Sequence, residues 1–118
     1  MNIETLSNGM KPLPTKWKKK GAEYTVLLRE HDVVLVELKR DGRTFYEVAH
    51  VQSHGGYTIA GVTMLAAEHM PGTEQWGTFG WSYADRPSAM AKFNDRVAIT
   101  ATFIAQHRQD SARQPKRV

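Results

Sequence analysis

Residues 71–83 read PGTEQWGTFGWSY, and this stretch decides the fold because short β-type segments precede it and one long helical pattern follows it. It holds two of the three tryptophans and three of the nine glycines. Gly77 and Gly80 permit positive φ or a close backbone approach that a Cβ would hinder. If residues 78–83 are extended, alternate side chains share one face. The stretch is therefore predicted to carry the chain from sheet to helix, with a short strand over residues 79–83.

Four aromatic residues of this stretch are candidates for two roles: Trp76, Phe79, Trp81 and Tyr83. In the first, they close one end of a small core, because aromatic rings bury a large area while keeping a polar tip available for a hydrogen bond. In the second, they form a protein-binding surface, because Trp and Tyr dominate binding hot spots. Sequence alone leaves both roles open.

Upstream, four segments have the alternation or the β-branched content typical of strands: residues 23–29, 33–39, 44–52 and 57–62. Asp41-Gly42 is the preferred pair for a type I′ hairpin turn between the second and third. We expect further turns at His31-Asp32 and at residues 53–56, which gives an antiparallel meander. Residues 64–70 fit either one helical turn or a loop that crosses the sheet.

Downstream, Asp85 is a good N-cap, and Pro87 is tolerated in the first helical turn. One apolar stripe follows at helical spacing: Met90, Phe93, Val97, Ala101 and Ile104. The alternative is a break near Asn94-Asp95, with residues 97–104 as a final strand. The predicted fold is α+β, an antiparallel β-meander of four to five strands packed against one long C-terminal helix.

The distribution of charge divides the chain of 118 residues into three parts. Residues 1–22 carry five lysines against one glutamate, and the breakers Asn8-Gly9, Pro12 and Pro14 predict a basic flexible arm. Residues 23–106 form the single α+β domain and have more acidic than basic side chains. Residues 107–118 are basic and poor in hydrophobic side chains, so we expect a disordered tail.

The two basic ends suit a polyanionic partner. Trp17 lies inside a lysine run, where its ring can stack on a base while the lysines neutralise phosphates. The expected nucleic-acid-binding residues are Lys16, Trp17, Lys18, Lys19, Lys20, Arg113, Lys116 and Arg117. The alternative is that Trp17 folds back onto the domain and the lysines are only solvated.

Catalytic groupings and cofactor motifs are not found in the sequence, so we expect no enzyme, no cofactor and no metal site. His50 and His54 are four residues apart, but the strand assignment removes the helical face that such ligation needs. Glu47 is expected on the opposite strand face from His50, so an enzyme built on this pair has the least support. The lack of cysteine, of a secretory signal and of a long apolar run favours a cytoplasmic protein without a membrane span.

Several motifs carry a resemblance to small proteins encoded by phages and plasmids: EQWGTFGWSY at residues 74–83, AMAKFN at 89–94, Tyr46-Glu47-Val48 and Gly56-Tyr57. The match covers residues 43–95. More loosely, the Trp-Gly-x-x-Gly turn followed by a helix resembles the WGR domain of proteins that act at DNA ends. Thr78 stands where that domain carries its Arg, a departure from the pattern expected for phosphate contact by this loop.

Two functions follow as hypotheses. The first is a non-enzymatic accessory protein of a phage or plasmid that binds nucleic acid or a nucleoprotein complex. The second is a protein-binding inhibitor of a host defence system, such as an anti-CRISPR protein, which would use the mildly acidic body.

Overall fold

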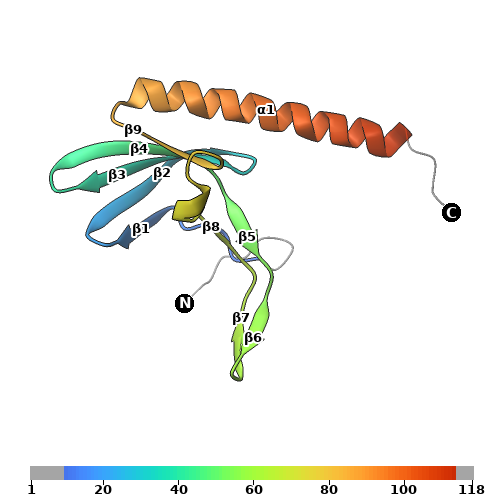
Figure 1. Cartoon of the computed structure of the whole chain (residues 1–118), viewed down its shortest axis with the longest axis horizontal. Coiled ribbons are helices and arrows are strands. Elements are labelled where there is room, and N and C mark those ends of the chain that lie inside the picture. Colours follow the sequence, from blue (N-terminus) through green and yellow to red (C-terminus); the bar gives the residue numbers. More distant parts are fainter. Residues whose placement is uncertain (1–9, 114–118) are drawn as a thin grey trace.

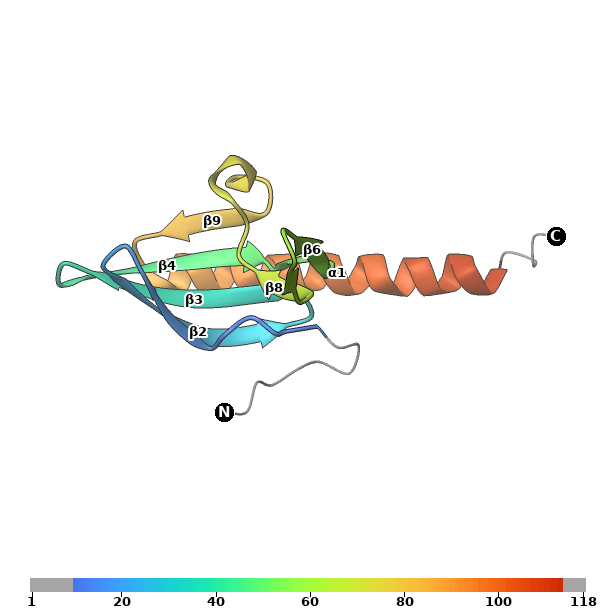
Figure 2. The same cartoon turned by 90° about the horizontal axis from the view of Figure 1, so that it is seen from below.

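The computed structural model describes residues 10–113 and shows an α+β fold, which confirms the predicted class (Figure 1). Within these residues, five strands form an antiparallel sheet in the order β1-β2-β3-β4-β9, and α1 (Arg86–Arg113) packs against it. The strands of this sheet are β1 (Lys16–Lys19), β2 (Ala22–Glu30), β3 (Val33–Arg40), β4 (Arg43–His50) and β9 (Gly80–Tyr83). Viewed at right angles, the helix lies along one face of the sheet (Figure 2).

Tight turns build the meander from consecutive strands. Asp41 and Gly42 have φ of 53° and 73°, the positive pair that a type I′ turn requires, so the predicted hairpin is confirmed. Lys20 and Gly21 repeat this geometry between β1 and β2, with φ of 50° and 78°. Both turns lie at the same end of the sheet, because the beginning of β2 pairs with the end of β3.

Strand β1 corrects the irregular arm expected over residues 1–22. Lys16–Lys19 pair with β2 in antiparallel register, and the ring of Trp17 stacks on that of Tyr24 across the pair. This strand is hard to recognise in the sequence because three of its four residues are lysines, which are depleted in strands. Burial of the single Trp and the backbone ladder hold it in place. Residues 1–9 lie outside the described part of the chain.

Strand β3 is buried on both faces and separates two cores. Val33 and Leu35 face the helix, where a helix-side core also includes Val48, Ala89 and Phe93. Val34 and Val36 face the other way, into an outer core with Ala49 and Val51. A strand covered on both faces needs a continuous apolar run, and residues 33–36 read VVLV. We call the two sides of the sheet the helix side and the outer face.

Helix α1 begins as predicted. The carboxylate of Asp85 accepts hydrogen bonds from the backbone N–H of Ser88, over 2.8 Å, and from its hydroxyl, over 2.9 Å. No break occurs at Asn94-Asp95, so the alternative of a final strand is wrong. The helix continues to Arg113, so the disordered tail expected from residue 107 is wrong over residues 107–113, and residues 114–118 lie outside the described part of the chain. Residues 107–113 contain no Gly or Pro, so nothing in them ends a helix.

A further correction concerns residues 52–69, which form a two-stranded ribbon that leaves the sheet (Figure 1). Its strands are β5 (Gln52–His54), β6 (Tyr57–Ile59), β7 (Val62–Met64) and β8 (Ala67–His69), paired β5 with β8 and β6 with β7. The predicted single strand over residues 57–62 and the turn at 53–56 are therefore wrong. The reversal occurs at Ala60-Gly61, where φ is 51° and 80°. Ala disfavours positive φ, so this turn is hard to recognise from its residues.

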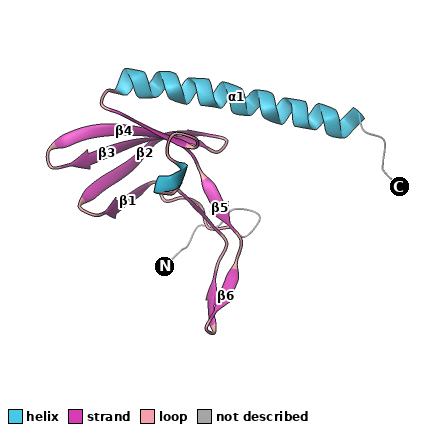
Figure 3. Ribbon diagram, in the orientation of Figure 1, coloured by secondary structure: helices cyan, strands magenta, loops and turns pink. Residues whose placement is uncertain are grey.

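The chain returns from the ribbon to the sheet through η1 (Thr73–Gln75), the short helix in Figure 3. Gln75 closes this turn by accepting a hydrogen bond from the backbone N–H of Gly72 at its Oε1, over 3.0 Å. Strand β9 then pairs with β4, which confirms the predicted short strand in the glycine-aromatic stretch. Among the described residues, no helix has the length and apolar character needed to cross a membrane.

Candidate functional site

A pocket of about 450 Å³ opens on the outer face of the sheet. Trp17, Tyr24 and Trp76 supply its aromatic lining, so we call it the aromatic pocket. Its volume falls within the range of about 300–1,000 Å³ that is usual for small-molecule sites. Its charged lining is mixed: Lys19, Lys20, Glu47 and Glu74.

Trp17 reaches the pocket because β1 is an edge strand of the sheet. Its ring lies 5.1 Å from that of Tyr24, centroid to centroid, with an angle of 6° between the planes. The same ring packs against the outer core. Trp17 therefore folds back onto the domain and at the same time lines the aromatic pocket. Lys19 shares its strand face, whereas Lys16 and Lys18 alternate to the other.

Trp76 reaches the pocket from the opposite direction, through the turn before β9. Gly77 adopts φ of 95°, and its N–H donates to the carbonyl of Gly80 over 2.7 Å, which folds the indole over Gly80. A Cβ on Gly80 would lie 2.5 Å from Cε3 of that ring, so only glycine fits beneath it. The indole Nε1 donates to Oγ of Ser82 over 3.0 Å.

Glu47, on strand β4, contributes a carboxyl to this pocket. It pairs with Ser82 across β4 and β9, and it lines the pocket from the sheet itself. Burial raises the pKa of the Glu47 carboxyl; a hydrogen bond with Ser82 and the charges of Arg40 and Lys19 offset part of that effect. Ser82 thus connects the carboxyl of Glu47 to the indole of Trp76, because its hydroxyl accepts from the indole and can donate to the carboxyl.

Cations gather at the end of the sheet where the two type I′ turns lie. We call this the basic end: Lys18, Lys19, Lys20, Lys39, Arg40 and Arg43. All six are exposed. Glu23 and Asp41 are exposed carboxylates beside them. Glu37 forms an ion pair with Lys39, with 3.7 Å between Oε1 and Nζ.

Sequence reasoning found only half of the basic end. It identified the lysines of residues 16–20 but assigned the second half, Lys39, Arg40 and Arg43, to a mildly acidic body. The turn pattern contained the missed signal. The β1–β2 and β3–β4 hairpins are joined by the pairing of β2 with β3, so their turns must lie at the same end of the sheet. Arg113 is the last residue of α1, and Lys116 and Arg117 lie outside the described residues.

The four aromatic candidates of the glycine-aromatic stretch are divided between the two sides of the sheet. Trp81 and Tyr83 pack against the helix-side core, whereas Trp76 covers the outer face. Phe79 and Trp81 both contact the ring of His50 edge-on, with centroids 6.4 Å and 6.1 Å away. The structure therefore does not bring Trp76 together with the other three.

His50 is buried and links the helix to the sheet rather than lining the pocket. Arg96 can only donate, so the contact of its Nε with His50 Nε2, over 2.9 Å, makes Nε2 the acceptor. The other nitrogen, Nδ1, then donates to Oδ2 of Asp32 over 3.0 Å. These contacts place His50 on the helix side and Glu47 on the outer face, so the two do not form a shared site.

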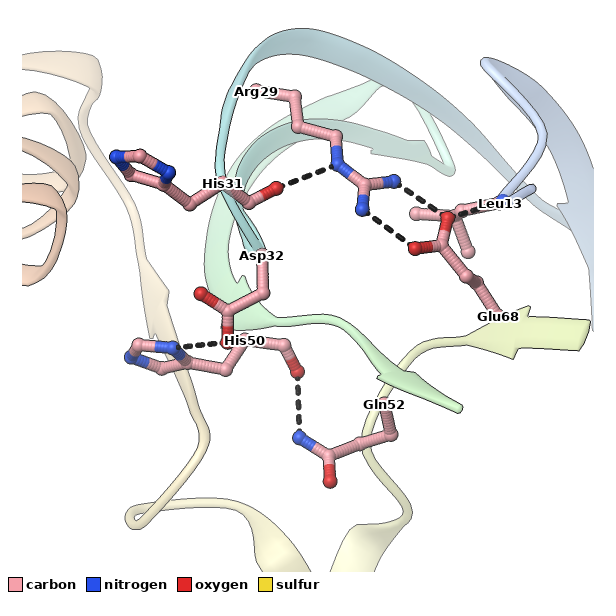
Figure 4. Close-up of polar contacts among 7 residues, drawn as sticks. All are labelled: Leu13, Arg29, His31, Asp32, His50, Gln52 and Glu68. Carbon is pink, nitrogen blue, oxygen red and sulfur yellow. Dashed lines mark hydrogen bonds and ion pairs between the residues drawn. The ribbon is translucent and has the colours of Figure 1, made fainter. Parts of the chain in front are cut away.

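Glu68 anchors the base of the ribbon to the sheet (Figure 4). Arg29 donates two hydrogen bonds to its carboxylate, over 2.8 Å and 2.7 Å, and the N–H of Leu13 donates a third over 3.1 Å. The hydrogen bonds from Arg29 lower the pKa of the Glu68 carboxyl. These hydrogen bonds let the carboxylate of Glu68 hold strand β8, strand β2 and the segment around Leu13 together.

No group of three or more His, Cys, Asp or Glu side chains with metal-binding geometry occurs within residues 10–113. No protein-family model, curated protein or solved structure matches the chain. The aromatic pocket and the basic end are thus the features from which a function must be argued.

Proposed function

We propose that the protein binds single-stranded nucleic acid through the basic end and the aromatic pocket, without catalysing a reaction. The observation that carries the proposal is that the basic end and the aromatic pocket are continuous with each other. Lys19 and Lys20 belong to both features. Arg40 lies near enough to offset the burial effect on the pKa of Glu47 in the pocket.

Single strands suit this arrangement for a physical reason. Proteins that bind them combine a cationic track for the phosphates with aromatic rings on which unpaired bases stack. The exposed cations of the two turns provide the first element, and Trp17 and Trp76 provide the second. A base inside a duplex is already stacked and paired, so the pocket favours a strand whose bases are free to leave the stack.

The test is the salt dependence of binding to a fluorescently labelled single-stranded oligonucleotide, followed by anisotropy. Affinity should fall steeply between about 50 and 200 mM salt, because each neutralised phosphate releases condensed counterions. Lys19→Glu/Lys20→Glu should weaken binding and reduce the log–log slope by about 0.7 for each phosphate that is no longer neutralised. Removing residues 1–20 is not an equivalent test, because it would delete strand β1.

Arg86→Glu supplies the matched control, since Arg86 is an exposed cation at the start of α1, on the other side of the sheet. This control should bind as the parent does. Salt-independent binding by the parent, or an equal weakening of binding in the control and in the lysine variant, would contradict the proposal.

The second candidate, a protein-binding inhibitor of a host defence complex, gains support from α1. Ile99 and Phe103 are 46% and 66% exposed on this helix, which extends past the sheet (Figure 1). Exposed apolar residues of this kind are typical of helices that bind protein grooves. Under this candidate, Ile99→Asp/Phe103→Asp abolishes capture of one stoichiometric protein partner, while Lys19→Glu/Lys20→Glu leaves it intact.

A further inference from the structure

The carboxyl of Glu47 lines the aromatic pocket beside Trp17, Tyr24 and Trp76. Within residues 10–113, no cationic side chain forms an ion pair with it. Its contact with the hydroxyl of Ser82 uses only part of its capacity, because a carboxylate offers about four acceptor positions. A carboxyl that is partly removed from water and incompletely bonded is costly, and a ligand that donates hydrogen bonds would relieve that cost.

The geometry of the pocket favours a flat ligand. Trp17 is held by its stack on Tyr24, and Trp76 is held over Gly80 by its hydrogen bond to Ser82. Indole rings that are fixed by their own contacts provide rigid stacking surfaces, which lose little conformational entropy on binding. A planar heterocycle can stack on such a ring while its edge contacts the polar lining.

The lining sets Lys19 and Lys20 against Glu47 and Glu74, a balanced charge that suits a neutral ligand better than a cationic one. Aromatic pockets with a carboxylate also bind ammonium groups, through cation–π attraction. Here Lys19 and Lys20 line the same pocket, and Arg40 is close enough to influence the pKa of Glu47. These cations repel an ammonium group but attract the phosphates on either side of a nucleobase.

We infer that the aromatic pocket takes one unstacked nucleobase of the bound strand and selects a base with an exocyclic amino group, which donates to the carboxylate of Glu47. Acidic side chains accept from cytosine N4 in the same way when proteins read bases. A base with a carbonyl at that position, as in uracil, presents a lone pair to the carboxylate and is repelled. This inference rests on the proposed nucleic-acid binding and adds base selectivity to it.

The experiment compares oligodeoxycytidine with oligodeoxyuridine, because these strands differ only at positions 3 and 4 of the base: an acceptor and an amino group in cytosine, an N–H and a carbonyl in uracil. Oligomers of about twelve nucleotides suit the usual site size of about 4–16. At pH 7 the parent should bind the cytidine strand about tenfold more tightly, the low end of what one base contact contributes. Glu47→Gln should reduce the difference to within about twofold, because an amide both donates and accepts.

Glu30→Gln is the matched control: Glu30 is an exposed carboxylate at the end of β2, outside the pocket lining, so its substitution should keep the tenfold preference. Equal, salt-dependent binding of both strands by the parent overturns the base selectivity and leaves the proposed function in place. Binding of neither strand overturns the proposed function. A tenfold preference that persists in Glu47→Gln overturns the role of Glu47. Displacement of the strand by an equal concentration of a trimethyllysine peptide overturns the choice of a base over a cation.

Discussion

Arg96, on the helix, donates from Nε to Nε2 of His50, on the sheet, over 2.9 Å. The other ring nitrogen of His50, Nδ1, donates a hydrogen bond to Oδ2 of Asp32. The guanidinium of Arg96 also lies 5.1 Å from the ring of Trp81, beside the ammonium of Lys92 at 4.3 Å. A polar chain therefore runs from the helix through the sheet to the turn between β2 and β3, and it fixes how far along the sheet the helix lies.

Arg96→Met tests this link. The substitution keeps an apolar stem near Trp81 but leaves the buried Nε2 of His50 without its donor. We expect the free energy of unfolding in urea to fall by about 1–3 kcal/mol, the cost of an unsatisfied buried acceptor. Arg86→Met, at the exposed first position of the helix, should stay within about 0.5 kcal/mol of the parent. Equal values for the two variants would mean that the hydrogen bond to His50 contributes nothing.

Gly42→Val tests the turn that sets the sheet's register. Gly42 has φ of 73°, and a β-branched residue there should cost about 1–3 kcal/mol through backbone strain. Gly55→Val is the control, because φ of Gly55 is not in the left-handed region and nothing lies within 4 Å of an added Cβ. Thermal unfolding should separate the two variants by several degrees. If they melt together, strain at Gly42 does not govern stability.

Trp76 and Gly80 should be coupled. Gly80→Ala forces a Cβ against the indole and should cost about 1–3 kcal/mol through overpacking. Trp76 is half-buried and lies outside both cores, so Trp76→Ala should cost less than the roughly 3–5 kcal/mol of a core aromatic. In the Trp76→Ala background, Gly80→Ala should become nearly neutral. An additive double-mutant cycle would show that the ring does not rest on Gly80.

Glu47→Gln should change stability in a pH-dependent way. The folded pKa of Glu47 lies above its ordinary value of 4.5, so the folded state holds this proton more tightly than the unfolded state. The corresponding stability is fully present below pH 4.5 and is lost as pH rises through the raised pKa. As pH rises from 4 to 7, the melting temperature of the parent should therefore fall relative to that of Glu47→Gln.

Glu68→Gln should show the opposite sign. Because Arg29 lowers the pKa of Glu68, the ionised carboxylate stabilises the folded state above pH 4.5, and this is lost as pH falls through the lowered pKa. The variant should melt below the parent at pH 7, and the difference should shrink in acid. A common trend for both variants would mean that general charge effects dominate.

The sequence predicted the parts of the fold that short-range chemistry determines. Asp41-Gly42 specified a hairpin, the apolar run of β3 specified a central strand, and Asp85 specified the helix start. Prediction failed where pairing overrides local preference. The lysines of β1 have low strand propensity, and Ala60 is an unusual turn residue, yet both are held by the partner strand across the ladder.

Only part of the candidate site could be predicted, because the sequence does not show which strands pair or in which register. Trp17 and its lysines stand out in the sequence because they are adjacent in it. Tyr24 and Glu47 do not stand out, because polar and aromatic residues are common in strands with alternating side chains and nothing nearby in the sequence marks these two. Only the register that places Trp17 against Tyr24, and Glu47 against Ser82, brings these side chains together.

The order of the sheet also bears on how the protein folds. Strands β1 to β4 pair with their immediate neighbours in the chain, so most of the sheet forms through short-range contacts, which favour rapid folding. Only β9 must close a loop, around residues 51–79, to reach β4. Closure entropy changes by only about 0.6 kcal/mol for each doubling of loop length. The outer half of the ribbon, residues 55–66, can therefore be lengthened or shortened with little effect on the folding of the sheet, which makes it the place where this protein can acquire new contacts most easily.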